Sequence, residues 1–202
     1  MTPGRRSSRL AAAIAGHEGD ADAARKLLHD PDPSTRAMAA GALSRMGALD
    51  TTALAAALGD PAPAVRRRAV ALAVPRPEVA LVALLADRDD SVVEAAAWAC
   101  GERCPPEPGA VAALAGVATG HGDPLCREAA AAALGAIGDD AGLPAVLAAT
   151  KDRATVRRRA VIALAAFDGP EVEAALHRAA GDRDWQVRQA AEDQLRATGC
   201  VT

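Results

Sequence analysis

Aromatic residues are almost missing from this sequence of 202 residues, which contains Trp98, Trp185, Phe167 and no tyrosine. Half of the residues are nevertheless apolar, so alanine, leucine and valine must fill the interior. Alanine is the best helix former, whereas β-sheets favour aromatic and β-branched residues. The composition therefore predicts an all-α protein in which the helices approach one another closely.

An excess of positive charge is also missing, since the formal net charge is −3. A protein whose whole surface binds nucleic acid is usually strongly basic. No long apolar run follows the arginines of residues 1–9, so we expect neither a signal peptide nor a membrane span. Four irregularly spaced cysteines do not form a secreted disulfide framework. We expect a cytoplasmic protein with reduced thiols, and the alanine and arginine bias suggests a bacterial source.

A short motif recurs about every thirty residues. Five copies end in an arginine, at residues 30–36, 60–66, 121–127, 151–157 and 182–188. A sixth copy at 87–94 has Val93 where the others have arginine. An alanine-rich run follows each copy. Aspartates in the motif suit the N-cap position, and Pro33 and Pro124 suit the first helical position, so each run is a predicted helix.

A shorter helix is expected before each copy, over residues 21–28, 51–58, 78–85, 111–118, 143–149 and 171–179. A further helix at 7–15 is predicted to cap the array. One helical hairpin cannot bury both of its faces, so the hairpins must stack into a solenoid. We predict an N-terminal arm and capping helix at 1–19 and one domain at 20–198. Its repeats are expected at about 20–47, 48–75, 76–104, 107–138, 140–168 and 169–198.

The pattern Asp-x-x-x-x-Val-Arg, followed by an alanine-rich helix and Leu-Gly, resembles bacterial HEAT repeats of the phycocyanobilin-lyase-like type. Residues 127–139, REAAAAALGAIGD, are similar to a consensus unit of that family. The resemblance covers residues 20–198 and implies a right-handed α-solenoid (α-α superhelix) of about six HEAT-like hairpins. It also implies a structural ladder of hydrogen bonds between neighbouring units. The residues that match its spacing are Asp30, Arg36, Asp60, Arg66, Asp182 and Arg188.

The sequence contains no convincing catalytic constellation. A HEAT enzyme resembling deoxyhypusine hydroxylase would need several His-Glu pairs for two irons, and the chain has the single pair His17-Glu18. Three cysteines and a histidine around the third and fourth repeats lack the spacing of a zinc site. These are Cys100, Cys104, His121 and Cys126. We therefore expect no enzyme activity, no metal and no cofactor.

Two arginine triplets, 66–68 and 157–159, occupy equivalent positions three repeats apart. The first arginine of each is expected to join the ladder, and the others to face solvent or form an anion-binding strip. A tryptophan in an alanine-rich helix usually fills core space, which is the expectation for Trp98. Trp185 stands beside an N-cap, where core packing and an exposed contact remain alternatives.

HEAT repeats serve several functions, so the resemblance leaves the function open. Our main interpretation is a non-enzymatic scaffold or adaptor that recognises a protein partner on its concave helical surface. The alternatives are nucleic-acid binding, resembling HEAT-like alkylpurine DNA glycosylases, and a lyase-like or enzyme-accessory subunit. No membrane partner is expected. The candidate binding residues are Arg67, Arg68, Glu94, Trp98, Arg158, Arg159, Trp185 and Arg188.

Overall fold

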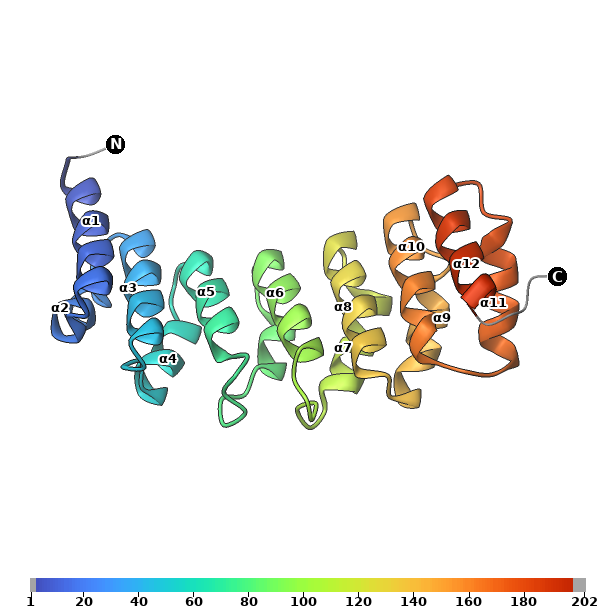
Figure 1. The fold of residues 1–202 in the computed structure, drawn as a ribbon, viewed down its shortest axis with the longest axis horizontal. Coiled ribbons are helices and arrows are strands. Elements are labelled where there is room, and N and C mark those ends of the chain that lie inside the picture. The colour runs from blue at the N-terminus through green and yellow to red at the C-terminus, as the bar shows by residue number, and fades with distance from the viewer. Residues whose placement is uncertain (1–2, 198–202) are drawn as a thin grey trace. The chain divides into compact units, whose positions relative to one another are not determined.

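A computed structural model describes residues 3–197 of the chain, with side chains from residue 8 onward. Within this range every regular element is a helix (Figure 1). None of the described helices combines the length and the apolar composition that a membrane-spanning helix needs. The chain forms two compact units, Met1–Ala80 and Leu81–Thr202. The predicted end of the last repeat at residue 198 lies outside the described residues.

Unit 1 consists of a first helix followed by two helical hairpins. Helix α3 packs against α1 and α5, while α2 and α4 form the second layer. The predicted helix at 7–15 is longer than expected and begins at Pro3. The elements are α1 (Pro3–Glu18), α2 (Ala21–Leu27), α3 (Pro33–Arg45), α4 (Thr51–Leu58) and α5 (Pro63–Ala73).

Unit 2 contains four hairpins. Helices α6, α8, α10 and α12 pack side by side, and the first helix of each hairpin packs behind them. The elements are η1 (Val82–Ala86), α6 (Asp90–Gly101), α7 (Ala110–Gly120), α8 (Pro124–Ile137), η2 (Asp140–Gly142), α9 (Leu143–Ala149), α10 (Ala154–Ala163), η3 (Leu164–Ala166), α11 (Pro170–Ala180) and α12 (Trp185–Ala197). We number the hairpins α2/α3, α4/α5, η1/α6, α7/α8, α9/α10 and α11/α12 as 1 to 6. The predicted all-α solenoid of about six hairpins is confirmed.

One predicted element is wrong. The helix expected at 78–85 is instead the 3₁₀ helix η1, which begins at Val82. Pro75 and Pro77 precede it and donate no backbone hydrogen bonds, which disfavours a longer helix. The Glu107 carboxylate accepts hydrogen bonds from the backbone amides of Leu81 (2.8 Å) and Val82 (3.3 Å). A loop glutamate thus accepts from amides that would otherwise donate to the carbonyls of a preceding helical turn.

Glycine allows the side-by-side helices of unit 2 to approach closely. A Cβ atom at Gly101 of α6 would lie 2.8 Å from Cα of Ala133 on α8. A Cβ atom at Gly135 of α8 would lie 2.6 Å from Cβ of Ala163 on α10. The larger fully buried side chains are all leucine and valine. The helices are therefore closely spaced, as the composition predicts, and small residues at their contacts set this spacing.

Candidate binding site

A forked arginine bond links the two hairpins of unit 1. Nε and Nη2 of Arg36 donate to the two carboxylate oxygens of Asp60, at 2.8 and 2.7 Å. Nη1 of the same side chain donates to the backbone carbonyl of Asp30 at 2.8 Å. Arg36 therefore binds the turn of its own hairpin and the carboxylate of the next one. We call such an arginine–aspartate pair a rung.

Unit 2 repeats this geometry twice. Nε and Nη2 of Arg127 donate to the carboxylate of Asp152, at 2.6 and 2.8 Å. Arg157 donates to the carboxylate of Asp182 in the same way, at 2.8 and 2.7 Å. Nη1 of Arg127 and Nη1 of Arg157 donate to the carbonyls of His121 and Asp152 at the start of their own motifs. Rungs therefore join hairpin 4 to 5 and hairpin 5 to 6.

The rungs fix the charge state of their members. The hydrogen bond from Arg127 is the main cause that lowers the pKa of Asp152. The hydrogen bond from Arg157 lowers the pKa of Asp182 in the same way. Each carboxylate also accepts a backbone amide at the turn of its own hairpin. A bidentate pair between partly buried groups is stronger than an exposed ion pair, so the rungs are structural contacts.

The joint between hairpins 3 and 4 lacks both members of a rung. Val93, which is fully buried, occupies the arginine position, and His121 occupies the aspartate position. Nδ1 of His121 accepts the backbone amide of Asp123 at 3.1 Å. In the other hairpins an aspartate oxygen accepts the corresponding amide, as Asp60 does from Ala62. The imidazole therefore reproduces the turn contact of the aspartate but not its negative charge.

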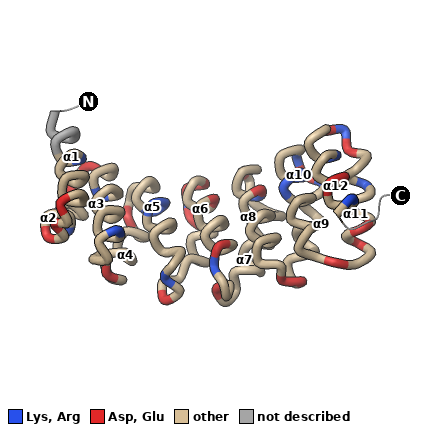
Figure 2. The backbone as a smooth tube through the Cα atoms, in the orientation of Figure 1, with Lys and Arg blue, Asp and Glu red and all other residues tan. Residues whose placement is uncertain are grey.

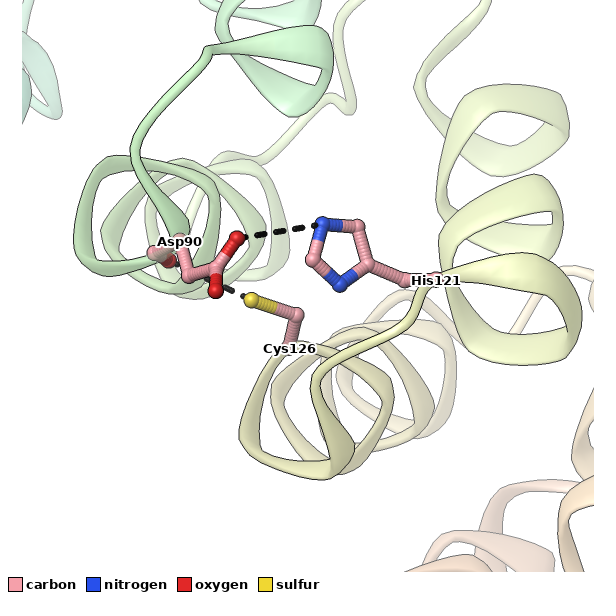
Figure 3. A group of neighbouring side chains, drawn as sticks. All are labelled: Asp90, His121 and Cys126. Carbon is pink, nitrogen blue, oxygen red and sulfur yellow. Dashed lines mark hydrogen bonds and ion pairs between the residues drawn. The ribbon is translucent and has the colours of Figure 1, made fainter.

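Three side chains with metal-ligating atoms gather at this joint (Figure 3). Nε2 of His121 lies 3.8 Å from Oδ1 of Asp90, the first residue of α6. The Cys126 thiol donates to the backbone carbonyl of Asp90 at 3.2 Å. The pKa of Cys126 is raised to about 11, mainly by burial and also by the nearby carboxylates of Asp123, Asp90 and Glu94. A buried thiol of this kind is a poor nucleophile, because only its thiolate form attacks.

Two neighbouring grooves cross the exposed side of α8, α10 and α12. The first, about 370 Å³, lies between α10 and α12. The second, about 330 Å³, lies between α8 and α10, and Ile162 and Ala165 line both grooves. Figure 2 shows basic residues on α10. The residues of the first groove are Arg158, Ile162, Ala165, Trp185, Gln186, Gln189, Ala190, Asp193 and Gln194.

The structure brings some of the predicted binding residues together. Arg158 and Trp185 line the first groove, and Trp185 is 64% exposed. Arg159 lines the second groove, where its Nη2 lies 3.6 Å from Oε1 of Glu128. Arg188 donates to the carbonyl of Asp182 at 2.8 Å, as a ladder arginine does.

Other predicted residues lie elsewhere. Glu94 and Trp98 are exposed on α6, so the expectation that Trp98 fills core space is wrong. Its 48% exposure follows from the alanine helices, whose close approach leaves no room for an indole between them. Arg67 and Arg68 are exposed on α5 of unit 1, and Arg66 is buried and donates to the carbonyl of Asp60.

Sequence reasoning missed Asp90 as a neighbour of His121 and Cys126. The predicted ladder included Asp182, which receives Arg157, but it did not include Asp152, which receives Arg127 and which the motif repeat could have identified. The histidine at the start of the fourth motif was a further signal, because it aligns with the aspartates of the other copies. Cys100 and Cys104 do not join the group at Asp90, and both are free thiols.

Comparisons with known proteins agree with this architecture. The family model described as HEAT repeats matches residues 78–157. YibA of Escherichia coli is 18% identical, with a TM-score of 0.65, over 96% of this chain and 75% of that chain. A designed armadillo repeat protein in complex with the peptide (KR)4 is 18% identical, with a TM-score of 0.59, over 95% and 98%. Human deoxyhypusine hydroxylase is 23% identical, with a TM-score of 0.50, over 94% and 78%. No protein of curated function matches the sequence.

Because all three identities are below 25%, the structural similarities show the fold alone. The matched segment runs through hairpins 3 to 5 as far as the second rung arginine of unit 2. Residues 78–157 match the HEAT-repeat family model, and the repeat spacing and paired helices outside that segment show the same helical-repeat architecture.

Proposed function

We propose that this protein is a non-catalytic binding module that recognises an extended acidic segment of a partner protein. The segment lies along the exposed side of α8, α10 and α12. The observation that carries the proposal is the first groove, where an exposed tryptophan, an exposed isoleucine and an arginine meet. The groove belongs to one compact unit, so a partner would meet a preformed surface.

The chemistry of the groove favours a peptide. Trp185 and Ile162 offer apolar area to an anchoring side chain, and tryptophan and arginine dominate the binding energy of many interfaces. Arg158 supplies a planar donor for a carboxylate. The amides of Gln186 and Gln189 can donate to and accept from a peptide backbone. Rigid helices carry all of these groups, so little conformational entropy is lost on binding.

The comparisons support this class of partner. The designed armadillo repeat protein is in complex with the peptide (KR)4, so a protein of similar fold binds a peptide. Arginines beside the groove of this chain favour the opposite charge in its partner. Free thiols at Cys100, Cys104 and Cys126 are consistent with the cytoplasmic location that we propose.

The experiment uses the two tryptophans as reporters. The chain has no tyrosine, so Trp98→Phe leaves Trp185 as the dominant source of fluorescence. Titration with a synthetic peptide of alternating glutamate and leucine should shift the Trp185 emission to the blue, because the indole leaves water. Arg158→Ala should weaken binding about fivefold, which corresponds to about 1 kcal/mol. The matched control is Arg153→Ala, an exposed arginine that precedes the same helix.

A lysine–leucine peptide of the same length tests the sign of the charge. Equal binding of both peptides, or equal loss in the Arg158 and Arg153 variants, would contradict the proposal. Binding of a DNA oligonucleotide in place of the acidic peptide, with a steep dependence on salt, would favour the nucleic-acid alternative. The lyase-like alternative stays a prediction of the sequence resemblance.

A further inference from the structure

The joint between hairpins 3 and 4 holds three different metal-ligating groups in the space where a rung would lie. Val93 stands where the other hairpins have a rung arginine, so this joint lacks the cation that would repel a metal ion. The replacement of aspartate by His121 adds a nitrogen ligand. Cys126 and Asp90 supply a sulfur and an oxygen from α8 and α6. The residues therefore come from two neighbouring hairpins and face one another (Figure 3).

The distances are close to those of a metal centre. The ligand atoms of the three residues all lie within 4.8 Å of one another, and the imidazole nitrogen is 3.8 Å from the carboxylate oxygen. Around tetrahedral zinc, sulfur and nitrogen ligands lie about 3.5 Å apart, given bonds of about 2.3 and 2.0 Å. The Asp90 side chain is 61% exposed, so a small rotation toward His121 and Cys126 would close the difference.

We propose that Asp90, His121 and Cys126 bind a divalent late transition metal of the zinc class, with solvent at a fourth position. Thiolate and imidazole ligands favour zinc and its neighbours over magnesium or calcium. The site joins hairpins 3 and 4 in place of the missing rung. It is separate from the grooves on α8, α10 and α12, and it does not depend on the proposed peptide binding.

Metal binding requires two proton changes. The Cys126 thiol loses its proton to solvent as the sulfur–metal bond forms, and its hydrogen bond to the Asp90 carbonyl ends. The His121 ring now accepts at Nδ1, which places its proton on Nε2. Coordination at Nε2 moves that proton to Nδ1, so the Asp123 amide loses its acceptor. The Asp123 amide signal is therefore a direct reporter of the site.

The test is a titration of the metal-free full chain with Co²⁺, followed by competition with Zn²⁺. We expect one equivalent of Co²⁺ to bind and to give a thiolate-to-cobalt charge-transfer band in the near ultraviolet. Zn²⁺ should displace it. In an NMR spectrum of the same sample, the Asp123 amide should shift. Cys126→Ser should abolish the band, and His121→Ala should weaken binding at least tenfold.

Two further variants separate coordination from folding. Cys104→Ser removes an exposed thiol outside the group and should leave the band unchanged. Asp90→Asn changes an exposed side chain, so it should keep the fold but weaken the metal affinity. A band that survives in Cys126→Ser, a band lost in Cys104→Ser, or the absence of stoichiometric binding to the folded native chain would each overturn the proposal.

Discussion

The joints of unit 2 differ in how neighbouring hairpins are held together. Hairpins 4, 5 and 6 are joined by rungs. Arg127 donates two hydrogen bonds to the carboxylate of Asp152, and Arg157 donates two to that of Asp182. Hairpins 3 and 4 have neither partner, because Val93 and His121 stand in those places. The two substitutions match each other. Loss of the arginine alone would have left a partly buried carboxylate without its cation, which is costly.

The comparison teaches that close helix packing and rungs are separable. The helices at the joint without a rung still approach through Gly101 and Ala133, as those at the next joint do through Gly135 and Ala163. Stacking therefore rests on small residues at both joints. The rung adds a directional arginine–aspartate contact at one end of the interface. Where the rung is absent, that end can hold other polar groups, such as Asp90, His121 and Cys126.

The largest expected effect comes from an attempt to rebuild the missing rung. Val93→Arg places a guanidinium at a fully buried position opposite His121, where the aspartate that receives a rung arginine is missing. We expect a loss of about 3 to 5 kcal/mol in the free energy of unfolding, as for a buried charge without its partner. The double variant with His121→Asp supplies the carboxylate and should recover about 1 to 3 kcal/mol of this loss.

A urea-denaturation cycle of the two single variants and the double variant measures the coupling between positions 93 and 121. Strictly additive effects would show that these positions are not equivalent to a rung, and the comparison between the joints would then fail. Circular dichroism of each variant checks that the helices remain.

The sequence alone predicted the paired helices because the motif repeats at a nearly constant interval and alanine strongly favours helix. It also located the arginines, since their spacing follows the repeat. It could not predict η1, because Glu107, which satisfies the amides there, comes from a loop 25 residues further on. The sequence also could not predict that Asp90 lies beside Cys126, because this contact depends on the register between two hairpins. The exposure of Trp98 depends in the same way on how closely neighbouring helices approach.

An intermediate effect is expected from glycines at the helix contacts. Gly135→Ala places a methyl group 2.6 Å from Cβ of Ala163, so the helices must move apart. We expect a loss of about 1 to 3 kcal/mol, as for other overpacked cores. Gly101→Ala should cost a similar amount, since its methyl meets Ala133 at 2.8 Å. The matched control is Gly116→Ala in α7, where nothing lies within 4 Å and alanine should stabilise the helix by up to about 1 kcal/mol.

Thermal melts of these variants compare the two joints directly. If Gly101→Ala is harmless while Gly135→Ala is destabilising, the joint without a rung is loosely packed. Packing and rungs would then not be separable features of this fold.

The smallest effect concerns the rungs themselves and their dependence on pH. Arg157→Ala removes the donor that lowers the pKa of Asp182. We expect a loss of about 1 to 2 kcal/mol at neutral pH, after allowance for partial exposure of the pair. A carboxylate with a lowered folded-state pKa stabilises the fold above its unfolded value of about 3.9. That stabilisation disappears as the pH falls through the folded-state value.

The native protein should therefore lose more stability between pH 7 and about pH 3 than the Arg157→Ala variant does. The measurement is the urea midpoint at both pH values, with Arg158→Ala as the control because its side chain is exposed on the same helix. Equal acid sensitivity of all three proteins would mean that Asp182 is not held by Arg157 in solution. The joint between hairpins 5 and 6 would then be held in solution without a rung, as the joint between hairpins 3 and 4 is.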